Sequence, residues 1–312
     1  NPGAMKIPKV SVLRPTYNAA SYVVSCVDSV LNQDYQNIEI IVIDDGSTDQ
    51  TESALAPYTE QIIYLKKNHA GLGSARNFAH QHASGEYIAW LDSDDIAHPH
   101  RITLQVAILE QNPSMTLVCG DFSAFRENGD CHSFYADRYY SQLEGADRHQ
   151  QLLGKPQSFI YADAPLELYR APVLSELVFG NFIHPPTVMF RAQLLASVKP
   201  MNETIRSSVD WLFLTRLARH GELGFVVNEL IDYRLSDSQI SSAKANPRRM
   251  IDVLRVFKEI CIENADVMAA NPQRHAKVLA EFQINAANSL LDVDKIQAAS
   301  LLKQSMACSA YK

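Results

Sequence analysis

The chain has 312 residues, a net charge of −7, 46% hydrophobic residues and 20% charged residues. These values are ordinary for a globular protein with a large core, and an acidic balance without a dense Lys/Arg stripe argues against nucleic acid as the main partner. The five cysteines are scattered and never spaced as CxxC, which argues against a disulfide framework or a cysteine zinc site and favours a reducing cytoplasm.

Strand and helix patterns alternate over the first 125 residues. The opening NPGAM, residues 1–5, indicates a remnant of cloning ahead of Met5 and is left out of the fold. Apolar or β-branched runs predict strands at Lys9–Tyr17, Ile38–Gly46, Gln61–Leu65, Tyr87–Leu91 and Thr116–Phe122. Helical spacing lies between them at Tyr22–Leu31, Gly71–Ala83 and His100–Pro113. Strands joined by helical crossovers predict a mainly parallel, Rossmann-like α/β sheet flanked by helices.

The second half of the chain is less regular. Residues 126–172 are aromatic and polar without periodicity, which indicates an insertion over one edge of the sheet. Order returns as a strand-to-helix segment at Thr187–Leu195, a helix at Val209–Gly221 and a strand at Phe225–Leu235. From Pro247 the pattern predicts two or three helices, so we expect an α/β domain over residues 6–245 and a helical extension over residues 246–312. No apolar run approaches the ~20 residues that span a bilayer.

Polar side chains gather at the expected ends of four strands. They are Thr16, Tyr17 and Asn18 after the first, Asp44 and Asp45 after the second, Asn68 and Gly71–Asn77 after the third, and Asp92, Asp94 and Asp95 after the fourth. In a doubly wound sheet, the carboxyl ends of the strands form the ligand site. Mg²⁺ or Mn²⁺ takes carboxylate oxygens together with substrate phosphate oxygens, so the clustered acids predict a half-finished metal site that a diphosphate completes.

Two other enzyme classes compete for such a site. A dinucleotide-dependent oxidoreductase would use Gly71–Arg76, with Asp92 as its ribose acid, but the first strand lacks the glycine fingerprint and the acid comes as a cluster. A Mg²⁺-dependent phosphohydrolase would use Asp92–Asp95 with an aspartyl nucleophile. That pattern is disfavoured because Ile96 replaces the expected hydroxyl residue or Val and because the strand is the fourth rather than the first.

Motifs spread along the chain carry a resemblance to a known family. They are Val10–Thr51, GLGSARN at Gly71–Asn77, GEYIAWLDSDD at Gly85–Asp95, FIHPPTVMFRAQLL at Phe182–Leu195 and VDWLFLTRLARHG at Val209–Gly221. Over roughly Lys9–Leu235 the chain resembles the family 2 glycosyltransferases with the GT-A fold. The resemblance implies a half that binds a nucleotide sugar, residues 6–125, and a half that binds the acceptor, residues 126–245.

The resemblance also implies a set of nucleotide-binding residues. They are Pro15, Tyr17, Asn18, Asp45, Arg76, Asp92 and Ser93. Tyr17 would stack on the nucleobase, and Asp45 would accept a hydrogen bond from it, most simply from a uracil imide. Arg76 would face the nucleotide, where a fixed cation balances phosphate charge.

The metal site implied by the resemblance uses the acids after the fourth strand. Asp94 is the predicted direct ligand and Asp92 lies toward the ribose or the metal, whereas Asp95 is either a third carboxylate or a helix cap. Relatives often carry a His after DYR, where this chain has Ser236 and Asp237. The missing His predicts a metal that binds weakly without nucleotide.

Asp210 matches the acid that acts as general base in inverting members of the family. Relatives often carry an acidic pair there, but Val209 replaces the first member. Trp211 would wall an acceptor sugar or join the core, and His184 is either an accessory site residue or a structural one. Arg14 interrupts an apolar strand without a functional explanation.

The sequence therefore predicts a metal-dependent inverting glycosyltransferase that uses Mn²⁺ or Mg²⁺ and a UDP-sugar donor. Its acceptor would be a glycan or lipid-linked oligosaccharide, as in capsule or O-antigen synthesis. We expect a cytoplasmic protein with at most peripheral contact at the inner face of the membrane. A non-catalytic nucleotide- or sugar-binding module is the alternative from outside the enzymes.

Overall fold

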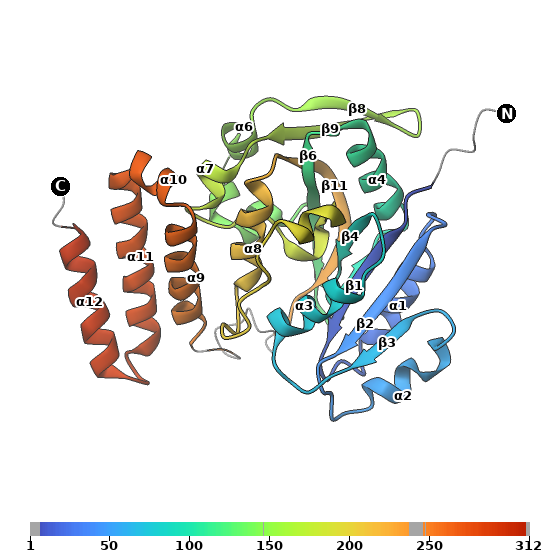
Figure 1. Cartoon of the computed structure of the whole chain (residues 1–312), viewed down its shortest axis with the longest axis horizontal. Coiled ribbons are helices and arrows are strands. Elements are labelled where there is room, and N and C mark those ends of the chain that lie inside the picture. The colour runs from blue at the N-terminus through green and yellow to red at the C-terminus, as the bar shows by residue number, and fades with distance from the viewer. Residues whose placement is uncertain (1–6, 146, 237–245, 247, 310–312) are drawn as a thin grey trace.

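The computed structural model describes residues 7–145, 147–236, 246 and 248–309 (Figure 1). The predicted cloning remnant at residues 1–5 and the predicted site neighbour Asp237 lie outside the described residues. One mixed sheet runs through the molecule in the order β3-β2-β1-β4-β10-β6-β11-β9-β8. The prediction of a parallel α/β core is confirmed.

Four parallel strands form the first half of the sheet. They are β1 (Val10–Thr16), β2 (Ile38–Asp44), β3 (Ile63–Lys66) and β4 (Tyr87–Trp90), with β1 between β2 and β4. Every residue of β1 is buried, as expected for a strand covered on both faces. The crossovers are made by helices α1 (Val23–Leu31), α2 (Thr51–Leu55) and α3 (Leu72–His82). Because the four strands are parallel, the carboxyl ends of β1, β2, β3 and β4 share one edge of the sheet.

The second half of the sheet is mixed. Strand β10 (Met189–Arg191) runs antiparallel between β4 and β6 (Met115–Phe125), and β11 (Glu222–Arg234) runs parallel to β6. Helix α4 (Arg101–Gln111) packs on β6. Two short strands add to this half: β5 (Ile96–Ala97) pairs with β11, and β7 (Cys131–His132) pairs with β6.

The insertion predicted at residues 126–172 extends the sheet at the β11 edge. Helices α5 (Ala136–Tyr139) and α6 (Arg148–Leu153) come first, followed by the hairpin of β8 (Gln157–Tyr161) and β9 (Ala164–Ala171). Sequence reasoning missed the hairpin because only Phe159 and Leu168 of its strand residues are buried, so the strands lack the apolar pattern of a core strand.

Helix α7 (Leu174–Leu177) precedes α8 (Val209–Ala218) in the chain. The C-terminal helices stack outward from α8 (Figure 1). Helix α9 (Arg249–Glu263) packs on α8, α11 (Pro272–Leu290) on α9 and α12 (Lys295–Ser309) on α11, with α10 (Ala265–Ala270) as a connection. The sequence predicted two or three helices after Pro247, whereas the described residues of this region form four. No described helix combines the length and the apolar character needed to cross a bilayer.

Asp121 on β6 is a buried acid whose charge opposes folding. It is 5% exposed, and its Oδ1 accepts hydrogen bonds from the N–H groups of Phe122 at 2.8 Å and Ala136 at 3.1 Å. Burial raises the pKa of its carboxyl to about 6. A raised pKa in the folded state favours the protonated form, so stability is lost as the pH rises through about 6.

Asp121→Asn keeps the accepting oxygen and removes the titrating group. We expect the variant to raise the free energy of unfolding at pH 8 by up to about 3 kcal/mol and to raise it little at pH 4. Urea unfolding of both proteins at the two pH values measures this difference. An equal gain at pH 4 and pH 8 would mean that the buried charge is not the cause.

Candidate active site

Asn18 ties together the loops that follow β1 and β2. Its Oδ1 accepts hydrogen bonds from the backbone N–H groups of Thr48 at 2.8 Å and Asp49 at 3.3 Å, and its own N–H donates to Ser47 Oγ at 2.9 Å. Its φ of 48° lies in the left-handed region, which Asn adopts more readily than most residues. Asn18 therefore shapes the rim of the site, and its contact with a nucleotide stays a prediction.

Asp45 and Tyr17, the predicted partners of a nucleobase, both contact His69. Asp45 is 3% exposed, and its carboxylate accepts from Lys67 Nζ at 2.8 Å and from the N–H of Gly71 at 2.7 Å. His69 Nδ1 lies 2.9 Å from Asp45 Oδ2, and its ring stacks on Tyr17 with the centroids 4.2 Å apart. Sequence reasoning missed Lys67 and His69, although both stand in the polar run KKNHAGLG beyond β3.

One buried guanidinium joins the acid after β4 to the acid at the start of α8. Arg76, on α3, is 1% exposed; its Nη2 lies 3.0 Å from Asp92 Oδ1 and its Nη1 lies 3.7 Å from Asp210 Oδ2. Its guanidinium carbon lies 4.5 Å from the ring centroid of Trp90, so the indole face supports the cation. Asp92 and Asp210, far apart in the sequence, therefore share one cation.

Asp210 is a mostly buried carboxylate with basic character. Its Oδ1 accepts a hydrogen bond from the backbone N–H of Trp211 at 2.9 Å. Burial raises the pKa of its carboxyl above the usual range; the positive charge of Arg76 opposes that rise, and the negative charge of Asp92 adds to it. The result is a carboxylate that holds a proton more strongly than an exposed Asp does.

Two arginines hold the backbone of the acidic turn at its two ends. Arg101 Nη2 donates to the carbonyl of Trp90 at 2.8 Å, and Arg234 Nε donates to the carbonyl of Asp94 at 3.0 Å. The backbone N–H of Arg234 also donates to Asp95 Oδ1 at 3.1 Å. Sequence reasoning gave neither arginine a role; the available signal for Arg234 was its position at the end of a predicted strand.

The three acids of this turn differ in exposure. Asp92 and Asp94 are partly exposed, whereas Asp95 is completely buried. Burial, followed by the charges of Asp94 and Asp92, raises the pKa of Asp95 well above its usual range. Asp95 is thus turned into the fold, and its carboxylate is a structural acceptor for Arg234 rather than an exposed metal ligand.

Asp92 and Asp94, the two partly exposed acids, could supply some of the ligands of a hard divalent cation. No three His, Cys, Asp or Glu side chains of the described residues lie together as a metal site. Mg²⁺ and Mn²⁺ accept one or two carboxylates with substrate phosphates and water as their other ligands. The carboxylates of Asp92 and Asp94 could supply such an incomplete set of ligands. Arg76 contacts Oδ1 of Asp92, which leaves Oδ2 as the oxygen that would face a metal.

His184 lies in an aromatic cluster of the second half of the sheet. It is 4% exposed, its ring stacks on Phe122 with centroids 3.8 Å apart, and its Nδ1 lies 3.1 Å from the hydroxyl of Tyr140. Burial lowers the pKa of its imidazole to about 3, so the ring is neutral. The packing favours a structural role over a metal ligand.

The other predicted residues lie in β1, in the core or in the acidic turn. Trp211 is 3% exposed, donates from Nε1 to the carbonyl of Leu177 at 2.7 Å and stacks on Phe257, which favours its core alternative. Pro15 is buried within β1, and Ser93 is partly exposed in the acidic turn. Arg14 is completely buried, and none of its side-chain nitrogens has a hydrogen-bond partner among the described residues.

Comparison with known proteins places the chain in one family. Residues 11–164 match the family described as "Glycosyl transferase family 2". The chain is 30% identical over 241 residues to an uncharacterized glycosyltransferase of Rickettsia typhi, RT0329, and covers 68% of that protein with 77% of its own length. It is also 30% identical over 243 residues to TuaG of Bacillus subtilis, a putative teichuronic acid biosynthesis glycosyltransferase, covering 83% of it with 76% of its own length.

Some relatives are much longer. The chain spans 30 to 37% of the length of three further Rickettsia glycosyltransferases. Among solved structures, S. aureus TarS residues 1–349 in complex with UDP-GlcNAc superimposes with a TM-score of 0.65 at 22% identity, covering 95% of this chain and 79% of that one. The mannosyltransferase PcManGT from Pyrobaculum calidifontis, in complex with GDP-Man and Mn²⁺, gives a TM-score of 0.53 at 18% identity, covering 99% and 82%. These two structures share the fold.

The different surroundings of Asp94 and Asp95 predict different effects of the same substitution. Asp94→Asn removes a partly exposed carboxylate, and we expect the affinity for UDP in the presence of Mn²⁺ to fall about ten- to a hundredfold. Asp95→Asn keeps the oxygen that accepts from Arg234, so we expect the affinity to stay within about threefold. Calorimetric titration measures both. Equal losses would show that Asp95 is a ligand after all.

Proposed function

The chain belongs to glycosyl transferase family 2 and is a glycosyltransferase, and we propose that it transfers a sugar from a UDP-sugar to a hydroxyl group of a glycan with inversion at the anomeric carbon. The observation that carries this proposal is the contact of Arg76 with both Asp92, at 3.0 Å, and Asp210, at 3.7 Å. Arg76 thus holds together Asp92, which would bind the donor or its metal, and Asp210, which would deprotonate the acceptor.

The donor half of the site supports a uridine nucleotide. The exposed ring of Tyr17 offers a stacking face, and Asp45 offers an acceptor for a uracil imide N–H. His69 contacts both residues and its side chain is 53% exposed, so it is the contact that an incoming base would exchange. TarS, which shares the fold, was solved in complex with UDP-GlcNAc, so this fold accommodates the proposed class of donor.

The leaving diphosphate carries negative charge that the site can balance. Arg76 pairs with Asp92 in this region, and its Nε and Nη1 are buried without a hydrogen-bond partner among the described residues. Asp94 and Asp92 would hold Mn²⁺ or Mg²⁺, which neutralises the leaving diphosphate when bound. A structural neighbour, PcManGT, was solved with Mn²⁺.

Asp210 would supply the base. Its carboxylate takes the proton from the acceptor hydroxyl, and the oxygen attacks the anomeric carbon as the bond from that carbon to the phosphate oxygen breaks. The nucleoside diphosphate leaves from the opposite face, so the configuration inverts. Burial serves this step, because a carboxylate with a raised pKa takes a proton more readily than an exposed one.

The proposed pathway is the synthesis of a surface polysaccharide in the cytoplasm, on a glycan or lipid-linked acceptor. TuaG, which matches 76% of the chain, is a putative teichuronic acid biosynthesis glycosyltransferase. In this proposal residues 6–125 bind the donor, residues 126–245 bind the acceptor and residues 246–312 form a helical extension. The aromatic insertion after β6, residues 126–172, falls within this proposed acceptor half.

Asp210→Asn tests the role of the base. We expect kcat to fall by about 10²- to 10⁴-fold, because general base catalysis is lost, while the affinity for UDP stays within a few fold. Asp266→Asn is the matched control, since Asp266 also lies in the first turn of a helix and pairs with an arginine, Arg219, outside the site. An Asp210→Asn enzyme with near-normal kcat would contradict the proposal, and so would a wild-type protein that binds UDP without transferring sugar.

The raised pKa of Asp210 predicts the pH dependence of the reaction. A general base must be deprotonated, so kcat/KM for the acceptor should rise with pH through the pKa of Asp210, and that limb should lie above the usual Asp value of 3.8. The residual activity of Asp210→Asn should lack the limb. A wild-type profile that stays flat down to pH 4 would show that Asp210 is not the group that titrates.

A further inference from the structure

Arg234 contacts three separate segments: the acidic turn, the end of β6 with the turn that follows it, and the residue ahead of α1. It is the last residue of β11 and is 8% exposed. Its Nε donates to the carbonyl of Asp94 at 3.0 Å, and its backbone N–H donates to Asp95 Oδ1 at 3.1 Å. Its guanidinium also forms an ion pair with Glu127, in the turn after β6. The side chain therefore reaches from the end of β11 to the backbone that carries a proposed metal ligand.

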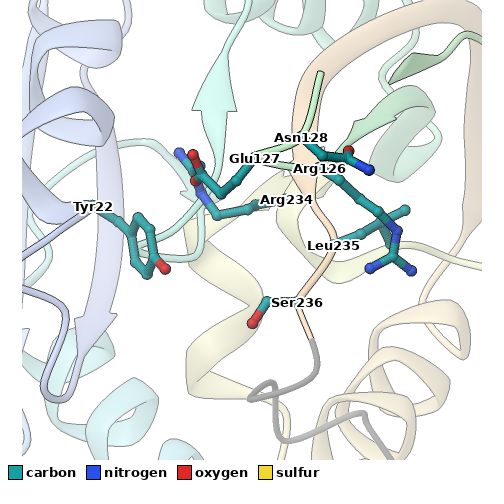
Figure 2. Close-up of a pocket in the computed structure, with 7 residues that line it drawn as sticks. All are labelled: Tyr22, Arg126, Glu127, Asn128, Arg234, Leu235 and Ser236. Carbon is teal, nitrogen blue, oxygen red and sulfur yellow. The ribbon is translucent and has the colours of Figure 1, made fainter. Parts of the chain in front are cut away.

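Two aromatic rings fix the plane of this guanidinium. The guanidinium carbon lies 4.5 Å from the ring centroid of Tyr22, ahead of α1, and 4.6 Å from that of Phe125, at the end of β6. Figure 2 shows Arg234 directed toward Glu127 and Tyr22, in a pocket of about 320 Å³ that Arg126 also lines. A planar cation held by two rings has little freedom, so its Nε–H holds a fixed direction toward Asp94.

We propose that Arg234 is a positioning residue that holds the Asp94 backbone, and with it the Asp94 carboxylate, in the geometry for binding a metal–nucleotide complex. This inference rests on the proposed function. The planar fork does the holding: a lysine would keep the charge and could still pair with Glu127, but it has no Nε–H donor and no plane to stack. Groups that orient metal ligands through hydrogen bonds contribute to metal affinity without touching the metal.

The test compares UDP affinity with Mn²⁺ and with EDTA, by calorimetry. Arg234→Lys and Arg234→Met should both weaken UDP binding in Mn²⁺ by about ten- to a hundredfold and leave binding in EDTA within about twofold. If Arg234 instead bound the diphosphate by its charge, Arg234→Lys would retain most of the affinity and Arg234→Met would lose affinity in EDTA as well. Either of those two results would overturn the inference.

Two control variants separate position from charge and from general packing. Arg126→Met removes a positive charge from the same pocket, where the Arg126 side chain is exposed and makes no ion pair with a described residue. Arg274→Met removes similar contacts elsewhere in the fold. Arg274 Nη2 donates to Glu176 Oε2 at 2.8 Å, and its guanidinium carbon lies 4.3 Å from the ring centroid of Phe179. Both should bind UDP like the wild type in Mn²⁺ and in EDTA. A loss in Arg126→Met as large as in Arg234→Lys would overturn the inference.

A further variant keeps the test decisive if the Arg234 variants do not fold. Glu127→Gln leaves the arginine in place and weakens one of its anchors at a side chain that is 70% exposed. It should lower UDP affinity about twofold or more in Mn²⁺ and not in EDTA, and unchanged affinity in Mn²⁺ would count against the inference. Wild-type protein that binds no UDP with Mn²⁺ would overturn the proposed function and this inference together, whereas metal-dependent wild-type binding with normal Arg234 variants would overturn this inference alone.

Discussion

Acids placed at the ends of buried parallel strands need compensating cations, and the structure supplies them as arginines. Three arginines from different elements contact the acidic turn. Arg76 of α3 pairs with the Asp92 carboxylate. Arg101 of α4 donates to the backbone before the turn, and Arg234 of β11 donates to the backbone of Asp94. Arginine suits this task because its planar fork can donate in several fixed directions. The turn is thereby held in a defined shape while two of its carboxylates stay open to solvent.

The same compensation joins the two halves of the proposed mechanism. Arg76 reaches Asp210 as well as Asp92, so the position of the base is tied to the position of the acid on the donor side. The indole of Trp90 supports this cation, and its Nε1 lies 3.2 Å from His80 Nε2 in the core. Burial lowers the pKa of His80 to about 3, which keeps that ring neutral beneath the arginine. The Arg76 cation that joins Asp92 and Asp210 thus packs on uncharged aromatic rings.

The sequence predicted the parallel core well because buried strands such as β4 carry continuous apolar patterns that need no tertiary context. It also predicted which acids follow the strands, since position at a strand end is a local property. It could not predict the β8–β9 hairpin, whose exposed residues lack periodicity, or the contacts of Arg76 and Arg234, which join segments far apart in the chain. Asp95 shows the same limit: it is a close neighbour of Asp94 in sequence, but only the fold shows that it is turned inward.

In the proposed mechanism the acids after β4 and Asp210 belong to one metal-dependent site. A crystal structure with UDP and Mn²⁺, in which anomalous scattering locates the manganese, tests it most directly. We expect a manganese peak within about 2.0 to 2.3 Å of an Asp94 oxygen and next to the diphosphate, with the diphosphate beside Arg76 and Asp210. Manganese at other side chains, or a diphosphate bound away from Arg76, would contradict it.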